Sequence, residues 1–233
     1  MGAFLDQRSP SEEAREPILR SPLIVNLFIL AFVAVHVGSV FLDDVSFNVF
    51  VENFSLIPQY FSAAPSAHWL PIEFSLLTYA FLHGDFVHLT VNVMWFLIFA
   101  TAVARRVGTA RFLGLMIVTT VGAALTHLAF YWGSPVPVVG VSGAVAGLMG
   151  SAFRFILPSP NSTSSWPPPA LPLFSRPVMM MTVVWVALNI VLGVSGLTPD
   201  GFGYSIAWEA HLGGYFSGLL LFPLFDRRRS WLS

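Results

Sequence analysis

Charged side chains are scarce in this chain: they make up 10% of its 233 residues, while 55% are hydrophobic, and the mean hydropathy is +0.74. A soluble domain usually carries about 25% charged residues, so these few charges cannot cover a water-exposed surface of the same size. Lipid is therefore the expected solvent for much of the chain. The net charge of −1 leaves no basic footprint for nucleic acid, so we expect membrane lipids as partners and no nucleic acid.

Cysteine is absent, which excludes disulfides and a thiolate nucleophile. The HExxH motif of zinc metalloproteases is also missing, and we predict no metal site. No internal repeat is visible, which argues against a transporter built from inverted repeats.

Six stretches are long and apolar enough, or nearly so, to cross the roughly 30 Å of bilayer hydrocarbon, which takes about 20 residues. They predict an all-α membrane protein, a bundle of six transmembrane helices over residues 21–226, between a polar segment at 1–20 and a basic tail at 227–233. The fourth and sixth stretches are weaker, because they contain polar residues and several glycines. The six are Leu23–Leu42, Phe86–Val103, Phe112–Tyr131, Val138–Leu157, Val178–Gly196 and Ile206–Phe225.

Lysine is absent as well, so arginine alone reports the orientation of the chain in the membrane. Basic residues stay on the cytoplasmic side. Every arginine precedes the first stretch, follows the last, or lies at the second or fourth connection, and the other connections have none. We therefore expect a multi-pass protein of the plasma or inner membrane with both termini in the cytoplasm.

The fourth stretch carries a serine among glycines. Ser142 stands in the sequence Gly140-x-Ser142-Gly143, and Gly143, Gly147 and Gly150 share one helical face. Such a face lets another backbone approach closely, and polar groups at membrane depth are candidates for function. Glycine and serine are also common packing residues in membrane helices, so this motif alone leaves both readings open.

The sixth stretch places His211 on one helical face with Gly214 and Gly218. If the two glycine faces pack together, the imidazole comes within reach of Ser142 and can take the proton that keeps a serine hydroxyl a weak nucleophile. The alternative is a buried histidine bonded to a backbone carbonyl in a packing seam. Glu209 points away from His211 and is expected at the membrane interface, so we predict a dyad rather than a triad.

Polar side chains also mark the start of the second stretch. His88 and Asn92 are four residues apart, and both can donate hydrogen bonds to an oxyanion; a polar helix end at the interface is the alternative. His83 is expected to order the preceding loop through hydrogen bonds. Asp85 is expected to cap the helix.

The candidate serine, histidine and donor pair agree in depth. The second, fourth and sixth stretches all enter from the outer side, and the candidates lie near their starts. Independent packing residues have no reason to agree in this way, and a channel would place polar groups along the full depth or at the midplane. The single histidines His36 and His127 are interpreted as packing or interface residues.

In order, spacing and position, these residues resemble the rhomboid intramembrane serine proteases. The resemblance covers about residues 20–226 and implies a six-helix bundle of the rhomboid type, with a water-filled cavity open to the outer side. The matching pieces are His83-x4-His88-x3-Asn92, Gly140-x-Ser142-Gly143 with Gly147, and His211-x2-Gly214-x3-Gly218.

The resemblance also implies a reaction that needs no cofactor. Ser142 would attack the scissile carbonyl, with His211 as general base and then general acid. His88, Asn92 and the backbone N–H of Ser142 would form the oxyanion hole. Substrates would be single-pass membrane proteins, cut in or near the transmembrane helix. The alternative is a catalytically inactive relative that binds membrane clients without cleaving them; such relatives usually lack the serine or the histidine, and both are present here.

Three features of the chain depart from the family pattern. Phe74 and Ser75 replace a frequent Trp-Arg pair, so the first loop must be held differently. Ala104 replaces an acidic residue at the end of the second stretch, and we expect a cytoplasmic-side hydrogen bond to be lost. Ala146 replaces an aromatic residue that stacks on the histidine, so we expect His211 to be less firmly held.

Overall fold

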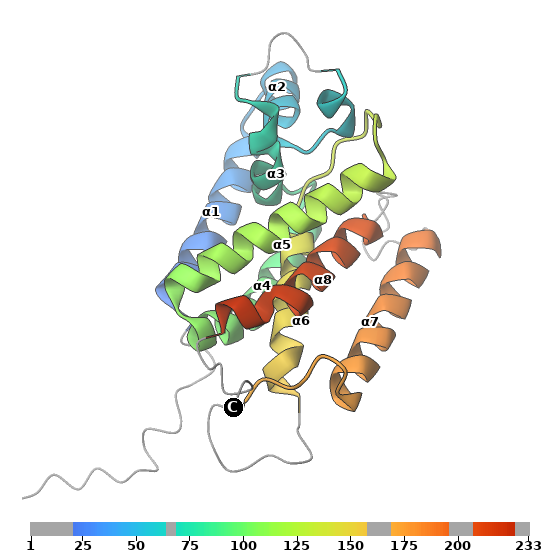
Figure 1. The fold of residues 1–233 in the computed structure, drawn as a ribbon. Helices are drawn as coiled ribbons and strands as arrows, with labels where there is room; N and C mark the ends of the chain where they lie inside the picture. The colour runs from blue at the N-terminus through green and yellow to red at the C-terminus, as the bar shows by residue number, and fades with distance from the viewer. Residues whose placement is uncertain (1–20, 64–68, 158–168, 196–206, 227–233) are drawn as a thin grey trace, which may run out of the picture.

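The computed structural model describes residues 21–63, 69–157, 169–195 and 207–226, and this part of the chain is helical almost throughout (Figure 1). The predicted all-α fold is confirmed. Three short 3₁₀ turns lie in the connection between the first two long helices. The α-helices of the described segments are α1 (Leu23–Val40), α2 (Asp44–Phe54), α3 (Ser75–Thr78), α4 (Phe86–Val107), α5 (Thr109–Phe130), α6 (Ser142–Ile156), α7 (Arg176–Ser195) and α8 (Trp208–Phe225).

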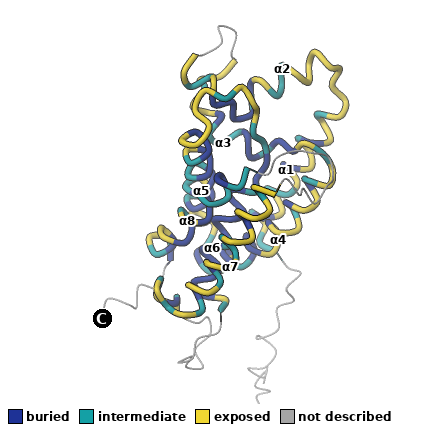
Figure 2. Tube along the Cα trace, turned by 90° about the vertical axis from the view of Figure 1, so that its right-hand side faces the viewer, coloured by how far each residue is buried: buried dark blue, intermediate teal, exposed yellow. Residues whose placement is uncertain are grey.

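Four of these helices, α1, α4, α5 and α7, are long and apolar enough to cross a membrane, and the chain is a multi-pass membrane protein. The other two long helices, α6 and α8, do not meet this criterion of length and apolarity. α6 has 15 residues, and α8 begins with Glu209 and His211 in its first turns. Figure 2 shows why this is tolerated: α6 lies in the buried interior of the bundle, whereas much of α1 is exposed. A helix that its neighbours shield from lipid does not need a continuous apolar surface.

α6 begins later than the hydropathy pattern suggests. The predicted stretch starts at Val138, but this residue is extended and forms an antiparallel bridge with Leu56, with N···O distances of 2.9 and 3.0 Å. The N–H of Gly140 donates to the carbonyl of Tyr79 at 2.9 Å, and Gly140 has a φ of +113°. The chain therefore reaches Ser142, the first residue of α6, through an extended segment tied to the long first connection.

The first connection is held by hydrogen bonds other than those of a Trp-Arg pair. Thr78 Oγ1 donates to the carbonyl of Phe54 at 2.8 Å, which joins the end of α2 to α3. Phe74 is exposed, whereas Ser75 is buried. Together with the bridge to the segment before α6, these contacts position the loop above the start of α4.

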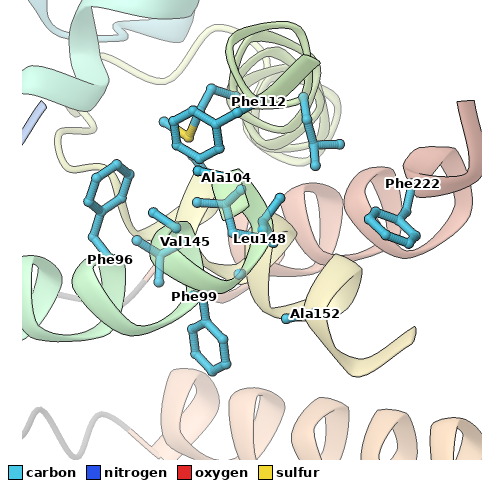
Figure 3. Packing of buried hydrophobic residues seen from close by; sticks show 14 of the residues in the cluster. Phe96, Phe99, Ala104, Phe112, Val145, Leu148, Ala152 and Phe222 are labelled. Carbon is cyan, nitrogen blue, oxygen red and sulfur yellow. The ribbon is translucent and has the colours of Figure 1, made fainter. Parts of the chain in front are cut away.

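The core lies around α6, which packs against α4, α5 and α8. Its members are aliphatic and phenylalanine side chains of α6 and of the helices around it. Figure 3 shows part of this cluster, with the labelled side chains Phe96, Phe99, Ala104, Phe112, Val145, Leu148, Ala152 and Phe222.

An ion pair joins the ends of α4 and α8. Arg106 Nη2 lies 2.8 Å from Asp226 Oδ2, and both side chains are almost fully buried. The guanidinium also lies over the rings of Phe155, at 4.5 Å, and Phe222, at 5.7 Å. The hydrogen bond expected to be lost at Ala104 stays a prediction, while an ion pair two residues further along joins this end of α4 to α8.

Candidate active site

The glycine faces of α6 and α8 pack backbone against backbone. A Cβ atom placed on Gly214 would fall on the carbonyl of Gly143, and one placed on Gly218 would fall on the carbonyl of Gly147. No side chain fits at either position without separating the helices. The packing predicted from the glycine spacing is confirmed, and it sets the distance between the two helix starts.

This contact between the glycine faces of α6 and α8, the glycine seam, brings a hydroxyl and an imidazole together. Ser142 is the first residue of α6 and His211 is the fourth residue of α8, and Ser142 Oγ lies 2.8 Å from His211 Nε2. Both residues are half-buried. This is the separation that a base needs in order to take a proton from a serine hydroxyl.

His88 and Asn92 border the same site from the first turns of α4. Asp85 caps this helix, as expected, because its Oδ1 accepts from the N–H of His88 at 2.7 Å. A Cβ atom on Gly140 would lie 2.9 Å from His88 Nε2 and 3.9 Å from Asn92 Nδ2. The two side chains thus face the backbone two residues before Ser142.

Hydrogen bonds around His88 and Asn92 orient their N–H groups. The N–H of Gly84 makes a weak bond of 3.4 Å to His88 Nδ1. Nδ1 is then the acceptor, which puts the ring hydrogen of neutral His88 on Nε2, beside Gly140. Asn92 Nδ2 donates one hydrogen to the carbonyl of His88 at 2.9 Å and has a second hydrogen. The N–H of Ser142 lies in the first turn of α6, where helix N–H groups have no intrahelical acceptor.

His83 plays a different part from the one expected. Its buried ring packs against Phe32, with centroids 5.8 Å apart, and against His88, at 5.3 Å. The ring nitrogens make no well-formed hydrogen bond to any described residue, whereas the backbone carbonyl accepts from His36 Nδ1 at 3.1 Å. Burial, followed by the neighbouring His88 and His36, lowers the pKa of His83 to about 3. The ring is therefore a neutral support for His88, and the well-formed hydrogen bond of His83, to His36, is made by its backbone.

Glu209 and His127 form a buried pair between α8 and α5. Glu209 is 1% exposed, and its Oε1 lies 2.5 Å from His127 Nδ1. The His127 ring stacks on Tyr131, with centroids 5.0 Å apart. Glu209 does point away from His211, but that direction leads to α5 and not to the membrane interface. The interface expectation for Glu209 was wrong, and His127 does more than fill space.

A polar contact that sequence reasoning missed holds the other side of His211. Asn189 Oδ1 lies 2.9 Å from His211 Nδ1, and Asn189 Nδ2 donates to the carbonyl of Trp208 at 2.7 Å. Asn189 therefore holds the ring of His211, and the effect of Ala146 stays a prediction. The signal was available: Asn189 is a buried amide in an otherwise apolar span, which is a candidate for function by default.

Comparison with known proteins identifies the family of the chain. Residues 73–228, which include all the candidate site residues, match the Rhomboid domain. The chain is 32% identical over 154 residues to a rhomboid protease GlpG of Yersinia enterocolitica, and 30% identical over the same length to those of Yersinia pestis and Yersinia pseudotuberculosis. Each alignment covers 66% of this chain and 48% of the relative, so the chain spans about half the length of the curated relatives it matches. The chain belongs to the rhomboid family.

Proposed function

We propose that this chain is an intramembrane serine endopeptidase that cleaves single-pass membrane proteins within or near their transmembrane segments. The observation that carries the proposal is the 2.8 Å contact between Ser142 Oγ and His211 Nε2 at one end of the bundle. Family membership supports it, because the matched relatives are rhomboid proteases.

The first half of the reaction forms an acyl-enzyme. Ser142 Oγ attacks the carbonyl carbon of the scissile peptide while His211 Nε2 takes the hydroxyl proton. The resulting oxyanion accepts hydrogen bonds from His88, Asn92 and the backbone N–H of Ser142. His211 then gives its proton to the leaving amine, and the C–N bond breaks.

The second half of the reaction releases the enzyme. Water attacks the ester carbonyl of the acylated Ser142, and His211 takes the proton from that water. The same donors stabilise the second oxyanion, which collapses as His211 returns its proton to Ser142 Oγ. Preorganised donors of this kind are worth about 10²- to 10³-fold in turnover each. Ser142 and His211 keep part of their surface exposed, which supports access of water to the site.

The arrangement of the helices supports six spans with the site toward the outer face. α6 and α8 would cross the membrane in the shelter of the more apolar helices α1, α4, α5 and α7. Arg106 lies in the last turn of α4, Arg154 lies near the end of α6 and Arg176 begins α7, all at the end of the bundle remote from Ser142. With arginine on the cytoplasmic side, both termini are cytoplasmic, residues 21–226 form the protease domain, and 1–20 and 227–233 flank it.

A cleavage assay in cells tests the proposal. A tagged single-pass reporter is co-expressed with the wild type or with Ser142→Ala, His211→Ala or Ser39→Ala. Ser39 is the matched control, because its hydroxyl bonds only within its own helix, to the carbonyl of His36. We expect cutting by the wild type and Ser39→Ala, and none by Ser142→Ala or His211→Ala. A further variant, Asn92→Ala, should still cut measurably but about 10²-fold more slowly.

Two results would decide against the proposal in different ways. Equal cutting by Ser142→Ala would place the nucleophile elsewhere. A folded wild type that binds the reporter and never cuts it would favour the inactive, client-binding alternative.

A further inference from the structure

We propose that Asn189, on α7, is the positioning residue that holds His211 in the tautomer able to activate Ser142. The inference rests on the proposed function, because it assigns a third group to the same site. It extends that function from a dyad to a relay whose last member lies on a different helix. Asn189 acts through His211 and has no contact with the reacting atoms.

The direction of every hydrogen bond in the relay follows from one backbone carbonyl. The carbonyl of Trp208 can only accept, so the Asn189 atom 2.7 Å away is Nδ2. The other amide atom, Oδ1, then faces His211 Nδ1 at 2.9 Å and can only accept from it. Nδ1 therefore carries the hydrogen of the neutral ring, and Nε2 is left with a lone pair. Ser142 Oγ–H donates to that lone pair at 2.8 Å.

Two other residues near His211, Glu209 and Ala146, do not orient its ring. The carboxylate of Glu209 contacts His127 on α5. Ala146 has no ring to stack on the imidazole. Asn189 is 8% exposed, and burying an amide is costly unless both of its ends are hydrogen-bonded. The contacts to Trp208 and His211 meet that requirement, and they do so by fixing the imidazole.

The relay also depends on how α7 docks against α8. Thr182 Oγ1 lies 2.8 Å from the hydroxyl of Tyr215, the Trp185 ring stacks on Tyr215 with centroids 4.3 Å apart, and Gly193 lies against Trp208. Trp185 also lines an apolar cavity of about 320 Å³ between α4, α6 and α7. In Figure 1, α7 (orange) stands at the edge of the bundle. The α7 face that contacts α8 consists of Thr182, Trp185, Asn189 and Gly193.

The tautomer of His211 can be read by NMR without any proteolysis. Protein with ¹⁵N-labelled histidine in detergent at neutral pH gives ring nitrogen signals, and those of His211 are assigned by their loss in His211→Gln. We expect Nδ1–H in the wild type, and a shift toward Nε2–H in Asn189→Leu, which has a similar size and no acceptor. An Nε2–H tautomer in the wild type would overturn the inference. A protein with Nδ1–H that cleaves nothing would instead overturn the proposed function alone.

Measurements of turnover distinguish a residue that positions His211 from a residue that only helps α7 to pack against α8. Asn189→Leu should lower kcat about tenfold with little change in KM, as expected for the loss of one hydrogen bond that acts after binding. Asn189→Asp keeps the acceptor oxygen for His211 Nδ1 but loses the donor to the Trp208 carbonyl, so its kcat should lie between those of Asn189→Leu and the wild type. Thr182→Val is the matched control, because it removes a hydrogen bond from the same face of α7 without touching His211.

The outcomes of this comparison are distinct. A selective loss of kcat in Asn189→Leu, partly rescued by Asn189→Asp, supports the inference. Equal losses in Asn189→Leu and Thr182→Val would mean that Asn189 only docks α7, and would overturn it. If Asn189→Leu does not fold, the wild-type NMR signal and the Asn189→Asp turnover still decide.

Discussion

The helix α8 meets its neighbours in two different ways. Toward α6 the contact is backbone on backbone, because Gly214 and Gly218 lie on the carbonyls of Gly143 and Gly147. Toward α7 the contact is made by side chains, through hydrogen bonds and ring stacking. The first contact sets how far apart the hydroxyl and the imidazole lie, and the second sets how the imidazole is turned. A backbone contact has no rotamer to relax, so the α6 side should tolerate much less change than the α7 side.

The largest effect is expected where a side chain is forced into the seam with α6. Gly218→Val would press two methyl groups into the Gly147 carbonyl, which cannot rotate away. We expect no stable folded protein and no cleavage. The matched control is Gly38→Val in α1, where a Cβ atom meets nothing within 4 Å; its stability should lie within about 0.5 kcal/mol of the wild type. Thermal unfolding in detergent gives both values, and similar losses at the two glycines would contradict the account of the seam.

A smaller effect is expected where α8 ends. Asp226→Leu would leave the buried guanidinium of Arg106 without its carboxylate, and breaking a buried pair in this way costs about 3 kcal/mol or more. The double variant Arg106→Leu/Asp226→Leu should be more stable than Asp226→Leu alone, because the buried guanidinium is removed together with its carboxylate. Arg106 and His88 are about 27 Å apart along α4, at 1.5 Å per residue, so turnover of the folded fraction should not change. A double variant less stable than the single one would show that the pair is not the main contact at this helix end.

The smallest effect is expected on the α7 side. Tyr215→Phe removes the hydroxyl that meets Thr182 and keeps the ring that stacks on Trp185. One hydrogen bond is worth about 0.5–1.5 kcal/mol of stability, and turnover should stay within about twofold of the wild type. Unfolding and cleavage measured on the same preparation check this. A loss as large as that at Gly218 would mean that both contacts of α8 are equally rigid.

The glycine seam could be predicted from the sequence because its pattern is local. Residues three, four or seven apart share a helical face whatever the rest of the chain does, so Gly143 and Gly147 could be matched with Gly214 and Gly218. The start of α6 was harder. Hydropathy does not distinguish an extended apolar segment from a helical one. The apolar pattern therefore predicts a start at Val138, whereas the helix starts at Ser142.

The buried polar contacts could not be predicted, because they depend on how separate helices are rotated against each other. Spacing placed Glu209 away from His211, but it did not show that α5 would lie on that side with His127. The sequence likewise shows Asn189 as a polar residue in an apolar span, without showing that this face of α7 meets α8. Partners 22 and 82 residues apart in the chain, such as Asn189–His211 and His127–Glu209, are set by the assembled bundle.

Covalent labelling tests the central claim most directly. Purified protein is treated with a fluorophosphonate and the modified peptide is identified by mass spectrometry. The account predicts a single phosphonylated serine, Ser142, in the wild type, with labelling lost in Ser142→Ala and much slower in His211→Ala. Labelling at another residue, or at Ser142 with undiminished speed in His211→Ala, would show that the contact between this hydroxyl and this imidazole does not activate a nucleophile.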